Sequence, residues 1–373
     1  MTNARFALFL TIVLSVWAAM HLYVFWRLAS VPWVAAHLSR RTLVVLVVVL
    51  WTSYPLARML DSLGLQAVSW PLEFAAANWI GILFLLLSML LVAEVVTLGG
   101  WVLLHWAPTL RGWAAITAGV LAAIGLILGM RSPVVRDYEV RLPGLKPEHD
   151  GLVLVELSDM HLGTLIGRRW MEHLVQRVDQ MRPDLVVVVG DLVDGNVGRV
   201  EPLRPVLKKL RAPLGVWAVT GNHEYYAGVE RCVRLLEEAG FSVLRDRSAE
   251  VAPGLVLAGV DDLTARQELG LEAHALDKAL TNRPPGPTIL LSHSPWKAEI
   301  AAQAGVGLML SGHTHNGQVW PFSYLVQLRY ALLGGRYQVG AMTAIVCRGT
   351  GTWGPRMRLW WPSEIVRIRL RTA

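Results

Sequence analysis

Five short apolar runs in the last two-thirds of the chain are each followed by side chains that can bind metal ions. The runs are residues 152–157, 185–189, 216–219, 288–291 and 308–310. Short runs that are apolar at nearly every position are typical of strands buried on both faces, as in the parallel sheets of α/β proteins. Ligands of such sheets collect at the carboxyl ends of the strands. The pattern therefore predicts an α/β fold with one edge that gathers all five polar segments.

The residues at these five strand ends offer oxygen and imidazole ligands and no thiolate. In chain order the candidates are Asp159, His161, Asp191, Asn222, His293, His313 and His315. This donor set suits manganese, iron, zinc or cobalt better than a soft metal. Two divalent ions about 3.5–4 Å apart can activate a water and stabilise both oxygens of a phosphoryl displacement. The pattern predicts a site for two divalent metal ions, with the identity of the ions open.

The order of these segments resembles the calcineurin-like metallophosphoesterase superfamily over about residues 136–371. The family signature D-x-H, G-D-x-x-D, G-N-H-E, a lone His and G-H-x-H is matched without a gap. The resemblance implies a β-sandwich flanked by helices and a dinuclear metal centre. It implies one metal held by Asp159, His161, Asp191 and His315, and another held by Asp191, Asn222, His293 and His313. The resemblance further implies two catalytic residues: Asp191 as the bridge between the metals, and His223 as the donor of a proton to the leaving oxygen.

Other polar residues near these segments have simpler explanations. Asp194 and Glu224 follow the same strands but are predicted to support the ligands or stabilise turns. Asp261 and Asp262 also follow an apolar run, and we predict turn chemistry there. Gly317-Gln318 and the later Arg348–Gly351 resemble the branch of the superfamily that carries N-terminal membrane segments.

The first third of the chain is predicted to lie in a membrane. The 373 residues are 54% hydrophobic with a mean hydropathy of +0.43. Four stretches of about 18–25 residues are long enough to cross a hydrocarbon core of about 30 Å. They are Phe6–Trp26, Thr42–Leu60, Phe74–Leu98 and Trp113–Met130. We therefore predict two domains, a transmembrane region of about four helices at residues 1–131 and a metallophosphoesterase domain at residues 132–373.

Three features of the membrane region stay open from the sequence. The second span contains Pro55 and Arg58, so three spans are an alternative to four. Glu94 lies inside the third span, where a carboxylate is a candidate functional group, but its position near the span end favours a side chain that reaches the interface. With four spans, the arginines near the span ends favour an extracytoplasmic metallophosphoesterase domain by a narrow margin.

Two later segments are unusually apolar or aromatic for a soluble enzyme. Residues 319–333 form a strongly apolar stretch, and residues 353–362 interleave tryptophans with Arg356 and Arg358. Both segments could pack as loop core. The functional alternative is a rim in the headgroup zone, with aromatic side chains at the interface and arginines toward phosphates.

The sequence as a whole predicts a multi-pass membrane enzyme that hydrolyses a phosphoester or pyrophosphate bond in a membrane-associated or lipid-linked substrate. The alternative is a catalytically weak phosphoester-sensing module that signals through its membrane helices. A transporter has little support because Glu94 stands nearly alone among the spans as an ionisable residue. The 35 basic and 28 acidic side chains form no basic stripe, so the predicted partner is the lipid bilayer and not nucleic acid.

Overall fold

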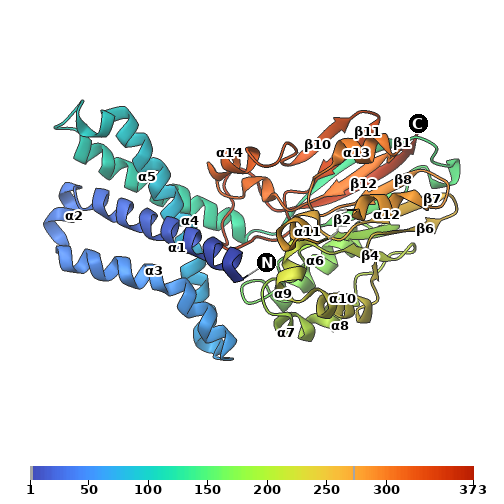
Figure 1. Ribbon diagram of the computed structural model, residues 1–373, viewed down its shortest axis with the longest axis horizontal. Coiled ribbons are helices and arrows are strands. Elements are labelled where there is room, and N and C mark those ends of the chain that lie inside the picture. Colours follow the sequence, from blue (N-terminus) through green and yellow to red (C-terminus); the bar gives the residue numbers. More distant parts are fainter. Residues whose placement is uncertain (1–2, 272–273) are drawn as a thin grey trace. The chain divides into compact units, whose positions relative to one another are not determined.

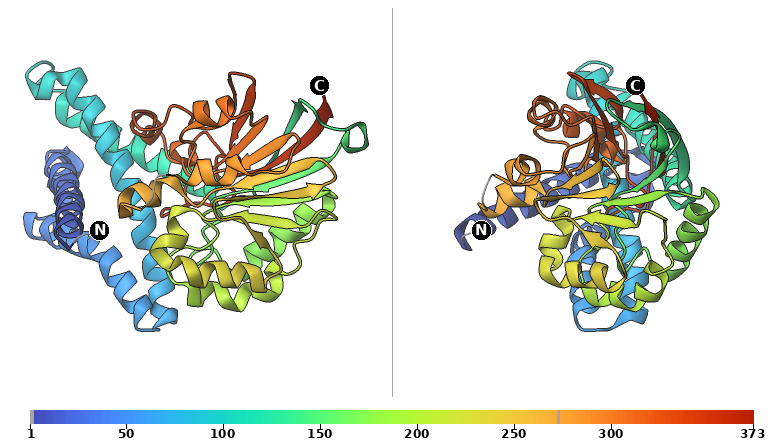
Figure 2. Two further views of the ribbon diagram at one scale, coloured as in Figure 1. Left: turned by 45° about the vertical axis from the view of Figure 1, so that its right-hand side comes forward. Right: turned by 90° about the vertical axis from the view of Figure 1, so that its right-hand side faces the viewer.

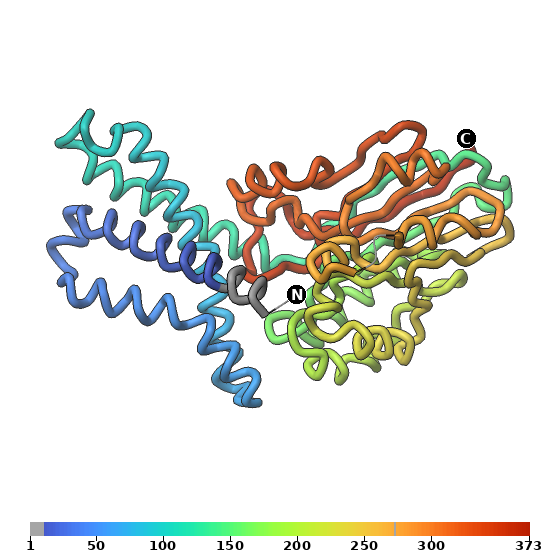
Figure 3. The backbone as a smooth tube through the Cα atoms, viewed as in Figure 1, coloured from blue at the N-terminus to red at the C-terminus, as the bar shows by residue number. Residues whose placement is uncertain are grey.

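The computed structural model describes residues 3–271 and 274–373, with side chains from residue 11 onward (Figure 3). The chain divides into two compact units. The helical unit comprises Met1–Met130, Val319–Pro321 and Gly354–Trp360. The α/β unit comprises Arg131–Gln318, Phe322–Trp353 and Trp361–Ala373. The helical unit therefore draws two short segments from the later part of the chain.

Four helices of the helical unit, among the described residues, are long and apolar enough to cross a membrane. They are α1 (Asn3–Leu28), α3 (Arg40–Ser62), α4 (Gln66–Thr97) and α5 (Ala107–Met130), with the short α2 (Pro32–His37) between the first two (Figure 1). Helix α3 continues through Pro55, so the stretch that the sequence leaves in doubt forms one helix. The first predicted span begins at Phe6, whose side chain lies outside the described residues.

Glu94 on α4 forms a buried ion network, which differs from the expectation that it reaches the interface. Its carboxylate accepts hydrogen bonds from Arg111 Nε at 2.7 Å and Nη2 at 3.2 Å. Arg27 Nη2 lies 3.1 Å from the same carboxylate, and Ser30 accepts a further bond from Arg111 at 3.0 Å. Because both arginines come from helix ends next to α4 in this unit, they neutralise Glu94 locally and it has no need to reach water.

The segment Gly354–Trp360 packs within the helical unit, which corrects one predicted role. Arg358 is fully buried and Arg356 is 9% exposed, so neither guanidinium faces lipid phosphates as the rim interpretation expects. Met357 packs beside Gly81 of α4 and Gly125 of α5, and the Arg358 amide donates to the Gly125 carbonyl at 2.8 Å. Small residues on the two helices let the backbone of this segment approach closely.

Gly129 of α5 provides a direct test of that packing. A Cβ added there would lie 2.4 Å from the carbonyl oxygen of Arg356, whereas a Cβ added at Gly119 of the same helix meets nothing within 4 Å. We expect Gly129→Ala to lower stability by about 1–3 kcal/mol through overpacking. Gly119→Ala should be neutral or slightly stabilising, because alanine is the better helix former. Thermal unfolding of the detergent-solubilised proteins measures both, and equal behaviour of the two variants would contradict the packing.

The α/β unit contains two six-stranded sheets. The first has the order β1 (Val134–Leu142), β12 (Glu364–Thr372), β2 (Val153–Leu157), β3 (Leu185–Val189), β4 (Val216–Val219) and β5 (Ser242–Val243). The second has the order β10 (Gly335–Val339), β11 (Met342–Val346), β9 (Leu308–Ser311), β8 (Thr288–Leu291), β7 (Leu255–Gly259) and β6 (Arg247–Ala252). The central pairs β2–β3–β4 and β7–β8–β9 are parallel. The fold is thus the helix-flanked sandwich that the family resemblance implies.

Three apolar clusters hold the layers of the α/β unit together. One lies between the two sheets, which stack face to face (Figure 2), and includes Leu154, Val187 and Leu291. A second joins β2, β3 and β4 to α6 (Arg168–Gln180), α8 (Arg204–Leu207) and α10 (Val229–Glu238). A third joins the other sheet to α12 (Ala275–Thr281) and α13 (Ala298–Gln303). Burial on both faces explains why the runs are apolar at nearly every position.

The five polar segments come from two different sheets. Strand periodicity alone wrongly predicts that they share the edge of one sheet. Strands β2, β3 and β4 belong to one sheet, and β8 and β9 belong to the other. A continuous apolar run gives no information about which sheet a strand joins, because both faces are buried in either case.

Candidate metal centre

The predicted ligands come together where five strands end. Asp159 and His161 follow β2, Asp191 follows β3, and Asn222 begins α9 (Asn222–Ala227) directly after β4. His293 follows β8, and His313 and His315 follow β9. Six of these seven residues are less than 9% exposed, and His313 is intermediate. The two sheets therefore deliver their polar residues to one buried site.

Five of these residues adopt a backbone conformation that non-glycine residues rarely use. The φ angles are 53° at Asp159, 47° at His161, 51° at Asp191, 69° at His313 and 48° at His315. Each left-handed residue carries a cost, and such residues cluster where surrounding structure holds functional side chains in place. The turns after β2, β3 and β9 thus direct polar side chains into the site.

Two glycines make these turns possible for different reasons. Gly190 has a φ of +75°, and a Cβ there would lie 2.6 Å from the His293 ring. Gly221 is extended, but a Cβ there would lie 2.2 Å from the carboxylate of Asp191. A side chain at either position would occupy the space that the polar groups need.

The first group of donors consists of Asp159, His161 and His315, whose ligand atoms lie within 4.8 Å of one another. His161 Nε2 and His315 Nε2 are 3.0 Å apart, and His315 Nε2 lies 3.3 Å from Asp159 Oδ1. Ser158 Oγ and the His313 amide donate to the Asp159 carboxylate at 2.8 Å and 3.0 Å, which fixes its orientation.

The second group consists of Asp191, His293 and His313, also within 4.8 Å of one another. His293 Nε2 lies 3.1 Å from Asp191 Oδ2, and His313 Nδ1 lies 2.9 Å from Asn222 Oδ1. His161 Nε2 lies 3.8 Å from the same oxygen of Asp191. Asp191 therefore stands between the two groups, which is the position that a shared ligand requires.

The chemistry of these groups fits divalent cations. His161 Nδ1 is buried and has no hydrogen-bond partner among the described residues. Burial lowers the pKa of His161 to about 4 and that of His313 to about 3, so both rings are neutral at pH 7, as metal ligands must be. Burial alone would lower the pKa of His293, but the Asp191 carboxylate outweighs burial and raises it well above its usual value. The site thus favours a positive charge beside Asp191.

His223 lies beside the donor groups and is held by Asp194. Its Nδ1 lies 2.9 Å from Asp194 Oδ1, and its backbone amide donates to Asp191 Oδ1 at 2.9 Å. Burial would lower the pKa of His223, but the carboxylates of Asp191 and Asp194 outweigh burial and raise it to about 9. A protonated imidazole at pH 7 can act as a general acid. Asp194 thus has the supporting role that the sequence indicates.

The Glu224 carboxylate binds backbone amides in the two turns next to Asp191. Its carboxylate accepts hydrogen bonds from the amides of Asp191 at 2.9 Å, Val193 at 2.9 Å and Gly221 at 2.7 Å. These bonds join the turn after β3 to the turn after β4. The sequence indicates this supporting role for Glu224. Asp262 has the turn role predicted for it, because its carboxylate caps α11 (Leu263–Leu269) by accepting from the Ala265 amide at 2.7 Å.

Two residues at the site are absent from the sequence-based candidates. The Tyr330 hydroxyl lies 2.7 Å from His313 Nε2, the ring nitrogen opposite the one that faces Asn222. The Trp353 ring, which is 52% exposed, makes an edge contact with His223 at a centroid distance of 5.7 Å. Gln318 holds the backbone of Trp353 through two hydrogen bonds of 2.9 Å. A lone aromatic residue far from a motif gives no signal in a sequence, so neither could be found without the fold.

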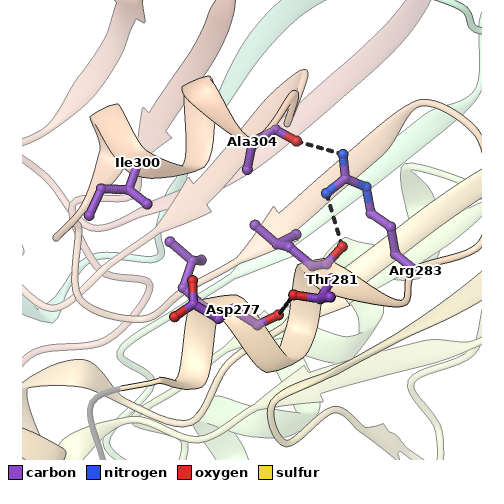
Figure 4. Close-up of a pocket in the computed structure, with 7 residues that line it drawn as sticks. Asp277, Thr281, Arg283, Ile300 and Ala304 are labelled. Carbon is purple, nitrogen blue, oxygen red and sulfur yellow. Dashed lines mark hydrogen bonds between the residues drawn. The ribbon is translucent and has the colours of Figure 1, made fainter.

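A surface pocket of about 260 Å³ lies away from these donors, between α12 and α13 (Figure 4). The Arg283 guanidinium at its wall donates to the carbonyl of Ala304 at 2.6 Å and to that of Leu280 at 3.3 Å. Thr281 Oγ1 donates to the Asp277 carbonyl at 2.7 Å. Because these donors are used on backbone carbonyls, the pocket is a packing feature and does not extend the metal centre.

This sandwich, with acidic and imidazole donors gathered at its strand ends, defines a protein of the metallophosphoesterase class. A profile of the calcineurin-like phosphoesterase family matches residues 152–317. An uncharacterized metallophosphoesterase from Aquifex aeolicus is 35% identical over 244 residues, covering 64% of this chain and 91% of that protein. The chain belongs to the calcineurin-like phosphoesterase family.

The chain is also similar to a second protein in sequence and to a solved structure in fold. A transmembrane protein with metallophosphoesterase domain from Danio rerio is 40% identical over 273 residues, covering 70% of this chain and 62% of that protein. A crystal structure of a dimetal phosphatase from Danio rerio matches with a TM-score of 0.34 at 14% identity, covering 54% of this chain and 88% of that chain. The name of the first protein and the four apolar helices support membrane association of this chain.

Proposed function

We propose that the α/β unit binds two divalent metal ions and hydrolyses a phosphoester or pyrophosphate bond. One ion would be held by Asp159, His161, Asp191 and His315, and the other by Asp191, Asn222, His293 and His313. The observation that carries this proposal is the arrangement of two donor groups from two sheets around Asp191. The ions would be manganese, iron, zinc or cobalt, because the donors are oxygen and nitrogen without sulfur.

The protein residues around the two ions would have distinct roles in the reaction. When bound, two such ions supply charge stabilisation and an activated water to phosphoryl transfer. Asp194 fixes the His223 ring by accepting from Nδ1, so that Nε2 holds the proton that the leaving oxygen takes. The oxygen of water bonds to phosphorus and gives up one proton to solvent, and the bond from phosphorus to the leaving oxygen breaks. A proton moves from His223 to that oxygen, and His223 then takes a proton from solvent.

The alternative of a catalytically weak sensing module is not favoured by the site. A sensing module needs metals and substrate contacts but no acid. His223 is nevertheless fixed at two points, because its Nδ1 lies 2.9 Å from Asp194 Oδ1 and its backbone amide donates to Asp191 Oδ1. This arrangement supports turnover over passive binding.

The substrate we propose is amphiphilic or lipid-linked, and the chain would cross the bilayer several times. The apolar helices and the absence of a basic stripe in the sequence support a lipid partner over nucleic acid. The arginines near the span ends favour an extracytoplasmic α/β unit. Glu237 on α10 is exposed, so Glu237→Cys gives a label position for this sidedness. A membrane-impermeant maleimide should label it in intact cells, and labelling only after lysis would place the unit in the cytoplasm.

A substrate panel tests the proposed reaction. The detergent-solubilised full chain, loaded with Mn²⁺, should release phosphate or phosphomonoester from at least one lipid, nucleotide or nucleotide-sugar ester. Chelation should abolish the release, and added Mn²⁺ should restore it. No turnover of any ester or pyrophosphate by a protein that retains two metal ions would support the sensing alternative.

Glu224→Gln tests whether Glu224 positions the metal ligands through its hydrogen bonds without binding a metal ion itself. An amide presents one oxygen and one NH₂ group, so it cannot accept all three of the backbone bonds that the carboxylate accepts. We expect the affinity for metal to fall by about 10–100-fold, as for other losses of ligand support. Excess Mn²⁺ should restore most of the activity. The exposed Glu237→Gln is the matched control and should titrate with Mn²⁺ like the unchanged protein.

A further inference from the structure

The short helix α14 (Phe322–Gln327) and the residue after it expose apolar side chains to an unusual degree. Phe322 is 41% exposed, Tyr324 63%, Leu325 53% and Leu328 85%. The helix has no buried residue. Scattered exposed apolar residues are common, but four within seven positions of one segment form a patch that marks an interaction surface. We call residues 322–328 the α14 segment.

We propose that the α14 segment inserts its apolar side chains into the headgroup region of a lipid bilayer. The segment contains no charged residue, so its insertion would depend on burial of apolar surface and not on attraction to anionic lipids. Arg329, the next residue, is engaged elsewhere. Its guanidinium lies over the Trp296 ring at 4.5 Å and donates to Gln267 Oε1 at 3.2 Å. The arginine thus anchors the end of the segment to the α/β unit.

The direct connection between α14 and the helical unit supports lipid as the partner that covers the α14 segment. Pro321, the residue directly before α14, belongs to the helical unit, and Val319 is buried in the apolar cluster of that unit. The four apolar helices of the same unit are long and apolar enough to cross a bilayer. The chain therefore enters the α14 segment straight from residues packed among membrane helices. Aromatic and aliphatic residues without charge are the composition that an interfacial position favours.

The α14 segment is also close in the chain to the candidate metal centre. Tyr330 follows Leu328 by two residues, and its hydroxyl meets His313 Nε2 at 2.7 Å. An inserted segment would therefore hold the metal centre near the headgroups, where a phosphoester of a lipid-linked substrate would lie. This consequence rests on the proposed function, whereas insertion of the segment does not.

A spin label at Leu328 tests the insertion without any assay of activity. The two native cysteines, Cys232 and Cys347, are both buried, so an introduced Leu328→Cys takes the nitroxide label selectively. Glu237→Cys on the exposed side of α10 is the matched control. The full chain is placed in nanodiscs of phosphatidylcholine, and collisions of each label with oxygen and with a polar nickel chelate are measured.

We expect the label at position 328 to collide several-fold more often with oxygen than with the nickel chelate, and the label at position 237 to show the reverse. Raising NaCl from 0.1 to 1 M should leave the first result unchanged, because the segment is uncharged. Equal access of nickel to both labels would overturn the inference. So would a label at 328 screened from both reagents, which would indicate a covering protein surface. An inserted label in a protein that hydrolyses no phosphoester would refute the proposed function and leave insertion intact.

Discussion

We expect Asp191→Asn to lose at least one metal ion and nearly all turnover while the fold survives. Asp191 Oδ2 lies 3.1 Å from His293 Nε2 and 3.8 Å from His161 Nε2, so one carboxylate serves both donor groups. An asparagine offers one oxygen ligand and an NH₂ group that cannot ligate. Its oxygen can still accept from the His223 amide, which preserves the local turn.

Three measurements check this result together. Elemental analysis gives the metal content, hydrolysis of an aryl phosphodiester gives the activity, and thermal unfolding reports the fold. Asp179→Asn, at an exposed position of α6, is the matched control and should keep both metals and full activity. If Asp191→Asn retained two metal ions and near-normal activity, this result would contradict the assignment of Asp191 as the shared ligand.

His223→Ala should keep its metal ions but slow hydrolysis by about 10²–10⁴-fold, the usual range for a lost general acid. Its ring is held by Asp194 at 2.9 Å and lies near His161 and Asp194, but it belongs to neither of the two donor groups described above. The loss should shrink for substrates with good leaving groups, such as nitrophenolate, because these groups depart without a proton.

Asp194→Asn serves as the companion variant to His223→Ala. It leaves the imidazole present but weakens the bond that orients it, so we expect a smaller loss with the same dependence on the leaving group. A loss that is equal for good and poor leaving groups would assign His223 a structural role. Falling metal content in either variant would also contradict the role of an acid.

Most residues of the candidate metal centre could be predicted from the sequence, because they lie in short segments that directly follow predicted strands. Asp159, His161, Asp191, His313 and His315 each follow an apolar strand, and the strand ends bring them together whatever the surrounding loops do. The supporting roles of Asp194 and Glu224 follow from the same proximity. Local sequence is informative here because each turn directs its own side chain into the site.

Features that depend on long-range packing could not be read in the same way. Tyr330 and Trp353 reach the centre from loops whose course depends on the whole fold. Arg356 and Arg358 carry charge, so their sequence predicts exposure, yet the glycines of α4 and α5 provide a surface against which their segment is buried. Glu94 is likewise satisfied by arginines that only helix packing brings near.

Anomalous diffraction from crystals of the full chain grown with Mn²⁺ tests the central claim most directly. We expect two peaks about 3.5–4 Å apart, the spacing of two-metal hydrolases. Asp191 should lie between the peaks, with Asp159, His161 and His315 around one and Asn222, His293 and His313 around the other. A single peak, or peaks that do not contact Asp191, would contradict a shared-ligand dinuclear centre.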